Sequence, residues 1–566
     1  MGTSELVAGQ AAYLAIDGDP SLHQTTTELI RTIAAAQGPA FGAFLLLELW
    51  AGSDADRGDL VFRIHCPAHG APGSILEEFE SGLLGVAVDE VRSRVEIVYD
   101  DAWCPPGLLR FGDVNRDPVV HIGLEIPAVH IDTDTGEVLP FEHRALRHGV
   151  GRALKLALYD FTHTCTTTRP AHFHELGPQA MTPGVLEIDR RLAELSDRFD
   201  LLLHVTPTNG HDAEAEFIEG GHSRTPEFLY RPRTVDPAVM KRHLYEIPIE
   251  RIEDPTLAHI FHKKREELDR QATLIADRNT PRFLLGSRAL YGDPDQSLIE
   301  LATDLLLRTD PDPEEPMGGG ADVLADRARE ELIAYRRVDP DLRSEVEVRD
   351  DVPGVMVSGG DLLIGRRARI PESRIEPLIA HEIGTHVLTH HNGRQQPFRE
   401  LYIGMAGYES LQEGLAVLSE FLVGGLRANR LRQLAARVIA TECILDGAEF
   451  VETYSVLHDR WAFTPGRAFE ITMRIYRGGG FVKDVVYLRG LTQVLDYLRS
   501  GEPVERLYLG KVSHPHLDLV EELEWRKLLR APRLLPRYLE RDDVNERLER
   551  CRTWSGIQDL REEIAR

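Results

Sequence analysis

The first 180 residues carry four short runs rich in apolar, β-branched and aromatic residues, with polar or turn-forming residues between them. Such runs are typical of β-strands. Two longer segments, 74–90 and 142–162, repeat apolar residues at three- and four-residue spacing, which predicts amphipathic helices. We therefore expect an α+β fold here. The expected strands are FGAFLLLELW (41–50), LVFRIHC (60–66), VEIVYD (95–100) and VVHIGLEIPAVHI (119–131).

From about residue 181 the pattern changes to long amphipathic helices, which dominate the rest of the chain. The clearest are 184–205 and 255–278. Residues 310–320, DPDPEEPMGGG, combine proline, acids and glycines and predict a loop. After it come a helix at 322–335 and three alternating segments, SEVEVRD, GVMVSGG and DLLIGRRA, which predict a small sheet. We expect two domains, 1–180 and 181–566.

Charge and composition exclude several function classes. The chain has 65 basic and 92 acidic residues, and its net charge of -27 opposes binding to the phosphate backbone of nucleic acids. The longest apolar stretch, 41–50, contains Glu48 and is far shorter than the roughly 20 residues that cross a bilayer. We therefore expect neither nucleic acid nor a membrane as a partner.

The five cysteines and the N-terminal segment bear on the compartment. The cysteine count is odd and the chain has no C-x-x-C pair, which argues against a disulfide framework or a thiolate metal site. The first residues, MGTSELVAGQ, lack the basic and apolar regions of a secretory signal. We expect a cytoplasmic protein.

One segment, IPESRIEPLIAHEIGTHVLTHHNG (370–393), predicts a helix that carries His381, Glu382 and His386. In zinc peptidases with the pattern H-E-x-x-H, two histidines four residues apart share one helix face, and the glutamate acts as a general base. Here the histidines are five residues apart, which on an ideal α-helix turns them roughly 140° away from each other. A one-residue π-bulge near Gly384 would absorb the extra position, and such bulges occur mainly at functional sites.

A zinc ion held by two histidines needs a third protein ligand. The segment YESLQEGLAVLSEFL predicts a second helix, within about 408–425, that carries Glu413 at 27 residues after His386. A carboxylate among so many apolar residues is costly unless it is paired or binds a metal. Glu420 lies seven residues further on the same helix face and would accept a hydrogen bond from a histidine ligand. The two active-site helices are thus expected at about 373–391 and 408–425.

The combination of HEIGTH, QEGLA and GGGFVKDVVYLRG resembles the QEGLA-motif family of HExxxH zinc metallopeptidases, which includes the microtubule-associated tyrosine carboxypeptidases. The segments YEIPIERIEDPTLAHIF and NTPRFLLGSRALYG extend the resemblance over about residues 181–530. Eukaryotic members of this family remove a C-terminal tyrosine from tubulin. The N-terminal region resembles the extension found in bacterial members of the family. Such members carry the name flavohaemoglobin expression-modulating QEGLA motif protein.

The resemblance implies a fold and a ligand set. For residues 181–566 it implies a mainly α-helical, zincin-like domain of the gluzincin type with a small sheet, preceded by a mixed α/β domain of unknown role. Carried over position by position, it makes His381, His386 and Glu413 the zinc ligands. It makes Glu382 the catalytic acid and base.

The segment RIYRGGGFVKDVVYLRGL (474–491) places Arg477, Lys483 and Tyr487 around three glycines. A glycine-rich, basic turn that opens a helix can bind an anion, although it is also typical of an ordinary helix start. Together with the resemblance, it leads us to expect that Arg477 and Lys483 bind a substrate carboxylate. Tyr487 or Lys483 would stabilise the oxyanion of the reaction.

These features together predict a zinc-dependent metallopeptidase of the carboxypeptidase type, acting on the C-terminus of a peptide or protein. A zinc amidohydrolase that acts on a small molecule would use the same ligands. A regulatory or binding protein with a non-catalytic zinc site is a further alternative, and Glu382 argues against it because a structural site has no use for a general base. The sequence leaves the oligomeric state open.

Overall fold

The computed structural model describes residues 2–7, 10, 12–16, 19–52, 60–67, 73–99, 119–132, 134–313, 315, 318–352 and 354–564. The chain divides into two compact units. The first comprises Met1–Val185, Ile249–His259 and Leu519–Leu529, and the second comprises Leu186–Pro248, Ile260–Asp518 and Arg530–Arg566. Two segments from the later part of the chain thus belong to the first unit. A single boundary at residue 180 would have assigned both segments to the second unit. The assignment of these units as functional domains stays a prediction.

The first unit is built on a four-stranded mixed sheet in the order β1-β6-β2-β5. Strand β6 pairs in parallel with β1, with Phe44 opposite Val119, and β2 pairs in parallel with β5. Strands β2 and β6 are antiparallel, with Ile64 opposite Leu124. The described α-helices and strands of this unit include α1 (Gly2–Glu5), α2 (His23–Phe41), β1 (Phe44–Ala51), β2 (Val61–Cys66), α3 (Gly73–Leu84), β3 (Ala87–Val88), β4 (Val91–Arg92), β5 (Arg94–Tyr99), β6 (Val119–Ile126), α5 (Pro140–Cys165) and most of α22 (Leu517–Trp525).

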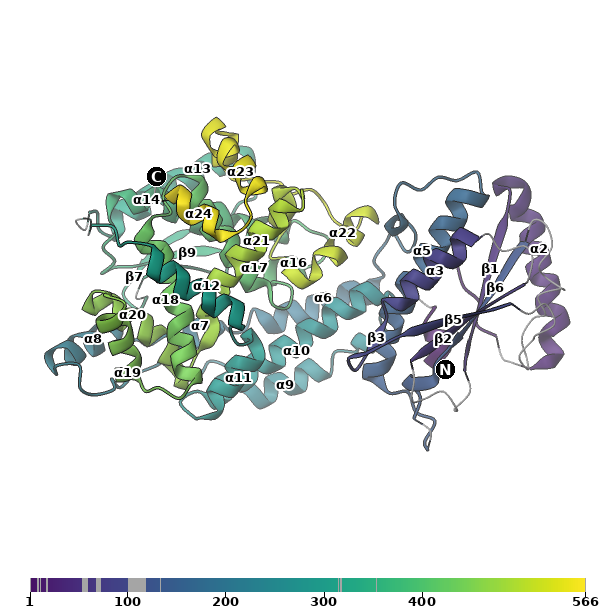
Figure 1. Ribbon diagram of the computed structural model, residues 1–566, viewed down its shortest axis with the longest axis horizontal. Coiled ribbons are helices and arrows are strands. Elements are labelled where there is room, and N and C mark those ends of the chain that lie inside the picture. Colours follow the sequence, from purple (N-terminus) through teal and green to yellow (C-terminus); the bar gives the residue numbers. More distant parts are fainter. Residues whose placement is uncertain are drawn as a thin grey trace. The chain divides into compact units, whose positions relative to one another are not determined.

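One face of this sheet is apolar and packs against α3 and α5, which lie side by side (Figure 1). Phe62 and Ile64 of β2 are completely buried there, as is Phe79 of α3. Burying one side chain of this size contributes about 1.5 to 3 kcal/mol. Helix α2 packs on the other face, where Ile30 contacts the cluster around Val119. All four expected strands are present, although β6 ends at Ile126 rather than at residue 131. The helix expected at 142–162 is confirmed, whereas the helix expected at 74–90 ends at Leu84, and residues 87–88 form strand β3. Helix α2 was not predicted.

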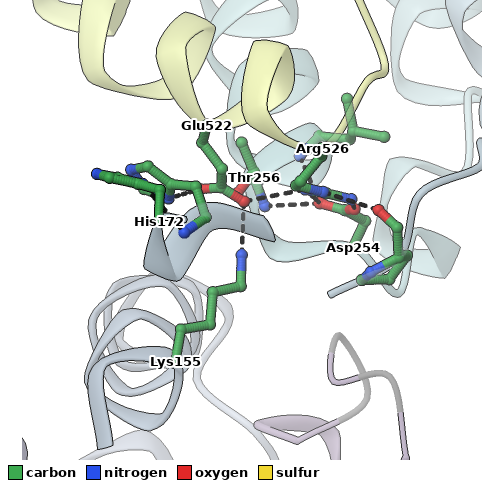
Figure 2. Close-up of polar contacts among 9 residues, drawn as sticks. Lys155, His172, Asp254, Thr256, Glu522 and Arg526 are labelled. Carbon is green, nitrogen blue, oxygen red and sulfur yellow. Dashed lines mark hydrogen bonds and ion pairs between the residues drawn. The ribbon is translucent and has the colours of Figure 1, made fainter. Parts of the chain in front are cut away.

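A buried ion-pair network joins α5, α22 and the segment before α10 inside this unit (Figure 2). Three donors meet at Oε1 of Glu522: Lys155 Nζ at 2.6 Å, and Thr256 Oγ1 and Arg526 Nη1 each at 2.9 Å. Arg526 also pairs with Asp254. Burial opposes the ionisation of Glu522, but Lys155 and Arg526 outweigh it and lower its pKa to about 2. This network links both later segments to α5 of the first unit.

Replacing Glu522 by alanine is expected to lower the free energy of unfolding by about 3 to 5 kcal/mol, because Lys155 and Arg526 then lie buried without their shared carboxylate. Urea unfolding followed by circular dichroism measures the change. Asp293→Ala is the control, since it removes an ion pair of 2.7 Å with Arg288 in which both side chains are about 40% exposed. That variant should lose about 1 kcal/mol or less. Equal losses in the two variants would show that the buried network contributes no more to the free energy of unfolding than an exposed ion pair does.

The second unit is mainly helical, as expected, and holds one small sheet. Its described helices before the sheet are α6 (Pro183–Ser196), α7 (Leu201–Val205), α8 (Gly210–Glu219), α9 (Pro237–Tyr245), most of α10 (Pro255–Asp277), α11 (Arg282–Tyr291), α12 (Gln296–Arg308) and α13 (Ala321–Val338). Those after it are α14 (Ile375–His381), η7 (Glu382–Val387), α15 (Leu388–Arg394), α16 (Glu400–Ile403), α17 (Tyr408–Leu422), α18 (Ala428–Leu445), α19 (Phe450–Ser455), α20 (Pro465–Tyr476), η9 (Arg477–Gly479), η10 (Val482–Val485), α21 (Val486–Arg499), α23 (Asp542–Thr553) and α24 (Ile557–Ile564).

The small sheet supports the helix that carries the histidines. Its strands β7 (Val346–Arg349), β8 (Val355–Ser358) and β9 (Asp361–Gly365) confirm the three expected segments, with β9 in the centre. Ile364 of β9 and Leu332 of α13 share one buried cluster with Ile383 and Val387. This packing buries the apolar side chains of the histidine-bearing segment. The two histidines are not part of this apolar cluster.

The helix expected at 184–205 needs correction. It is interrupted at residues 197–200, and Asp200 caps a new helix, α7, by accepting a hydrogen bond from the Leu203 amide. Among the described residues, no helix is both long and apolar enough to cross a membrane.

Candidate metal centre

The histidine-bearing helix contains the expected distortion. Helix α14 ends at His381, and a π-helix, η7, continues it into α15. The Thr385 hydroxyl donates to the carbonyl oxygen of Ala380 at 3.3 Å, five residues earlier. The wider turn brings the ring centroids of His381 and His386 to 5.1 Å from each other. The π-bulge predicted from the five-residue spacing is therefore confirmed, and it places both imidazoles on one side of the helix.

Gly384 lies in this π-helix for a reason that the sequence does not reveal. A Cβ atom on it would lie 3.0 Å from Cε1 of Tyr538, so the glycine leaves room for the tyrosine ring. The Tyr538 hydroxyl is 2.8 Å from that of Tyr508, and burial holds its pKa well above the usual value. Close packing, rather than an unusual backbone angle, thus explains the glycine.

Helix α17 brings Glu413 to the two histidines. Its Oε2 atom lies 3.7 Å from Nε2 of His381 and 3.6 Å from Nε2 of His386. One ligand atom from each of the three residues falls within 4.8 Å of the others. Among the described residues, this is the only group of three or more histidine, cysteine or acidic side chains with such spacing.

The donor set fits a zinc ion. Bonds of about 2.0 to 2.2 Å in tetrahedral geometry separate neighbouring ligand atoms by roughly 3.4 Å, close to the two distances from Glu413 Oε2. That oxygen is buried and accepts no hydrogen bond from any described residue. A buried carboxylate oxygen without a donor is costly unless a cation takes the donor's place. His381, His386 and Glu413 therefore offer a suitable metal site.

Glu420 orients His381, as expected for a residue behind a metal ligand. Its Oε1 lies 2.9 Å from Nδ1 of His381, which leaves Nε2 facing Glu413. Burial opposes protonation of His381, but the carboxylates of Glu413 and Glu420 outweigh it and raise its pKa to about 9. The carboxylates around this imidazole thus favour a positive charge at the site.

Two arginines compensate the charge of Glu420, which has no exposed surface. Arg374 Nη1 lies 2.7 Å from its Oε2, and Arg430 Nη2 lies 3.1 Å from its Oε1. Burial raises the pKa of this carboxyl, but Arg430 and Arg374 outweigh it and hold the pKa well below its usual range. Neither arginine was predicted, because each comes from a different helix end and only the fold brings them together.

Two glycines allow α17 and α21 to touch. A Cβ on Gly414, the glycine of QEGLA, would lie 2.1 Å from the backbone of Gly490, and a Cβ on Gly490 would lie 1.7 Å from the Ser410 carbonyl oxygen. This approach brings Lys483, which precedes α21, to 3.4 Å between its Nζ and Oε1 of Glu413. Burial raises the pKa of Glu413, but Lys483 and the histidines outweigh it and hold the pKa well below its usual range. QEGLA thus supplies both an acid and a close helix contact.

The basic turn after α20 needs its glycines. Gly478, Gly479 and Gly480 have φ angles of 69°, 107° and 122°, which other residues rarely adopt. Arg477 is buried and its Nη1 donates to Thr206 Oγ1 at 3.3 Å. Tyr487 is partly exposed, and its ring centroid lies 5.7 Å from Lys483 Nζ. The structure therefore places Lys483 against Glu413 and Tyr487 next to Lys483, whereas Arg477 is buried against Thr206.

The part of the chain that carries the candidate metal centre is similar to known proteins. A family model described as "Microtubule-associated tyrosine carboxypeptidase" matches residues 215–555, which is more than half of the sequence. Two curated relatives, from Mus musculus and Homo sapiens, are both named "Putative tyrosine carboxypeptidase MATCAP2". They are 30% identical over 184 residues and 29% identical over 198 residues.

These matches are partial. They cover 30% and 32% of this chain, and the chain spans only about a third of the length of each relative, 34% and 37%. One solved structure, described as a "putative lipoprotein" from Colwellia psychrerythraea, is 13% identical with a TM-score of 0.31. The alignment covers 67% of this chain and 78% of that chain, and a TM-score this low carries no conclusion about the fold.

Proposed function

The chain belongs to the microtubule-associated tyrosine carboxypeptidase family, as its sequence motifs led us to expect, and from this membership we propose that it is a zinc-dependent carboxypeptidase. The observation that carries the proposal is the convergence of His381, His386 and Glu413 directly beside Glu382. Two imidazoles and one carboxylate are the protein ligands of many zinc peptidases, which keep a further position open for chemistry.

Zinc, when bound, supplies a Lewis acid that polarises the scissile carbonyl and makes a nearby water more acidic. Glu382 then takes a proton from that water and delivers it to the leaving amine. Its position supports this role, since it follows His381 at the first residue of the π-helix and only 7% of its surface is exposed. A carboxylate that directly follows a proposed ligand in the sequence, and is shielded from bulk solvent, is suited to proton transfer.

Lys483 and Tyr487 supply the remaining polar groups of the proposed site. Lys483 forms an ion pair with Glu413, so its charge mainly holds that carboxylate in place. The Tyr487 hydroxyl is therefore the group that we assign to the oxyanion that develops on the carbonyl. Arg477 is expected to contribute to binding the substrate's carboxylate, as a guanidinium can do with two parallel hydrogen bonds.

The proposed substrate is the C-terminus of a peptide or protein. Its free α-carboxylate distinguishes it from internal parts of the chain. If the enzyme recognises this carboxylate, amidation of the C-terminus should lower kcat/KM by about ten- to a hundredfold, since one charge-assisted hydrogen bond is worth about 1.5 to 3 kcal/mol. Zinc-loaded protein and a peptide library with paired acid and amide ends, analysed by mass spectrometry, provide the test.

Each other outcome of this experiment contradicts part of the proposal. Equal cleavage of acid and amide ends would indicate an endopeptidase. Cleavage of small amides alone would indicate an amidohydrolase. A protein that binds one equivalent of zinc but cleaves nothing would favour a non-catalytic zinc site.

A further inference from the structure

Three arginines surround one aspartate next to the proposed site. Arg474 forms two hydrogen bonds with Asp484, one of them 2.9 Å between Nη2 and Oδ1. Arg437 of α18 lies 3.3 Å from the same carboxylate and Arg477 lies 3.9 Å from it. The Asp484 side chain has no exposed surface. Glu470 also interacts electrostatically with Arg474 and Arg437, so two carboxylates face these three cations and the cluster keeps an excess of positive charge.

Arg437 and Arg477 keep unused donors. Each is only 4% exposed. Nevertheless, Nε and Nη1 of Arg437 and Nε and Nη2 of Arg477 donate no hydrogen bond to any residue that the structure describes. Buried guanidinium donors without acceptors are rare, because each has lost its contact with water. Burial lowers the pKa of Arg477 to about 10, which shows how poorly its charge is compensated.

Both arginines interact with Tyr487, which lies next to Lys483. The Arg437 guanidinium lies 4.5 Å from the ring centroid of Tyr487, and Lys483 Nζ lies 5.7 Å from the same centroid. Lys483 in turn contacts Glu413, one of the proposed ligands. The partly exposed ring of Tyr487 therefore lies near both the Arg437 guanidinium and Lys483, the residue that pairs with Glu413.

We propose that Arg437 and Arg477 together bind the free α-carboxylate of the substrate's last residue. This inference rests on the proposed function, and it adds Arg437 as a residue that determines specificity. A carboxypeptidase cleaves the last peptide bond, so only one residue separates the scissile carbonyl from the terminal carboxylate. Because consecutive Cα atoms are about 3.8 Å apart, the carboxylate must bind close to the metal. A carboxylate accepts several hydrogen bonds, and two guanidinium groups match it in geometry and charge. Lys483 is then not a ligand of the terminal carboxylate, because Glu413 already pairs with it.

The test measures binding by calorimetry, so that it does not depend on turnover. The probe is 2-benzylsuccinate, which can place one carboxylate on the metal and offers a second one. Its comparison is 3-phenylpropanoate, which has a single carboxylate. With the zinc-loaded full chain, benzylsuccinate should bind at least about tenfold more tightly than phenylpropanoate. Equal affinities in the wild-type protein would overturn the inference.

Arg437→Gln should weaken benzylsuccinate binding by about ten- to a hundredfold and leave the binding of phenylpropanoate unchanged. Arg437→Lys, which keeps the charge but loses the two-pronged geometry, is the second variant if glutamine disturbs folding, and it should also bind benzylsuccinate more weakly. Arg432→Gln is the matched control, because Arg432 lies on the same helix and is 7% exposed, but its donors are used by three carbonyl oxygens. It should leave both affinities unchanged.

The inference and the proposed function can fail separately. If folded, zinc-loaded Arg437 variants bind benzylsuccinate as the wild type does, the carboxylate site lies elsewhere, even when the enzyme cleaves only free C-termini. If benzylsuccinate binding depends on Arg437 but the wild type cleaves no peptide, the anion site is supported and the proposed peptidase is not.

Discussion

Glu382→Gln is expected to keep one equivalent of zinc and to lose turnover by about a hundred- to ten-thousandfold. The amide is nearly the same size as the carboxylate, so the neighbouring ligands His381 and His386 stay in place. It cannot accept a proton at neutral pH, and removing a general base costs about this factor. The measurement is kcat on the best peptide of the acid-ended library, together with the metal content of the same sample.

The control for this variant is Glu376→Gln, which changes an acid six residues earlier in the same helical segment. Glu376 is largely exposed and pairs with Arg541 at the surface. Its replacement should leave turnover within a factor of two or three, since exposed ion pairs contribute little. Unchanged turnover in Glu382→Gln would remove Glu382 from the mechanism and leave the proton acceptor unassigned.

The local chemistry of the site could be predicted from the sequence because it depends on spacing along helices. The five-residue interval between His381 and His386 requires a wider turn if both imidazoles are to share a face, and the π-helix provides it. Glu413 and Glu420, seven residues apart, had to lie on one face of α17, and Glu420 does accept the bond from His381. Such inferences need only helix geometry.

The compensation of charge could not be predicted, because it joins residues that are far apart in sequence. Arg374 and Arg430 converge on Glu420 from two different helices. Arg437 lies on a helix whose sequence is typical of an ordinary amphipathic segment, and its unused donors become visible only when the fold buries it beside Asp484. Periodicity indicates which face of a helix is buried, but not which charges another element brings to that face.

The placement of Lys483 illustrates the same limit. Its position in a basic, glycine-rich turn indicated an anion site, and the anion nearest to it is Glu413 of the protein itself. The contact depends on Gly414 and Gly490, where two helices approach so closely that neither position accepts a side chain. The sequence shows these glycines, but it does not show that they face each other.

Glu413→Ala is expected to bind zinc more than about a hundredfold more weakly than the wild type, and to lose activity with it. Replacing a residue that only supports a metal ligand already costs ten- to a hundredfold in affinity, so the loss of a ligand should exceed that range. The wild type should contain one equivalent of zinc per chain after reconstitution, measured by elemental analysis, and the variant should retain little after dialysis against a weak chelator.

Removing Glu413 also leaves Lys483 buried without its partner, which destabilises the protein independently of zinc. Glu413→Gln, which keeps the shape of the side chain, together with circular dichroism of both metal-free variants, separates loss of metal from loss of fold. A folded Glu413→Ala protein with a full zinc complement would transfer the third ligand to another acid, and Glu420 is the nearest candidate because it already contacts His381. In that case Glu413 would act mainly by holding Lys483 beside the histidines.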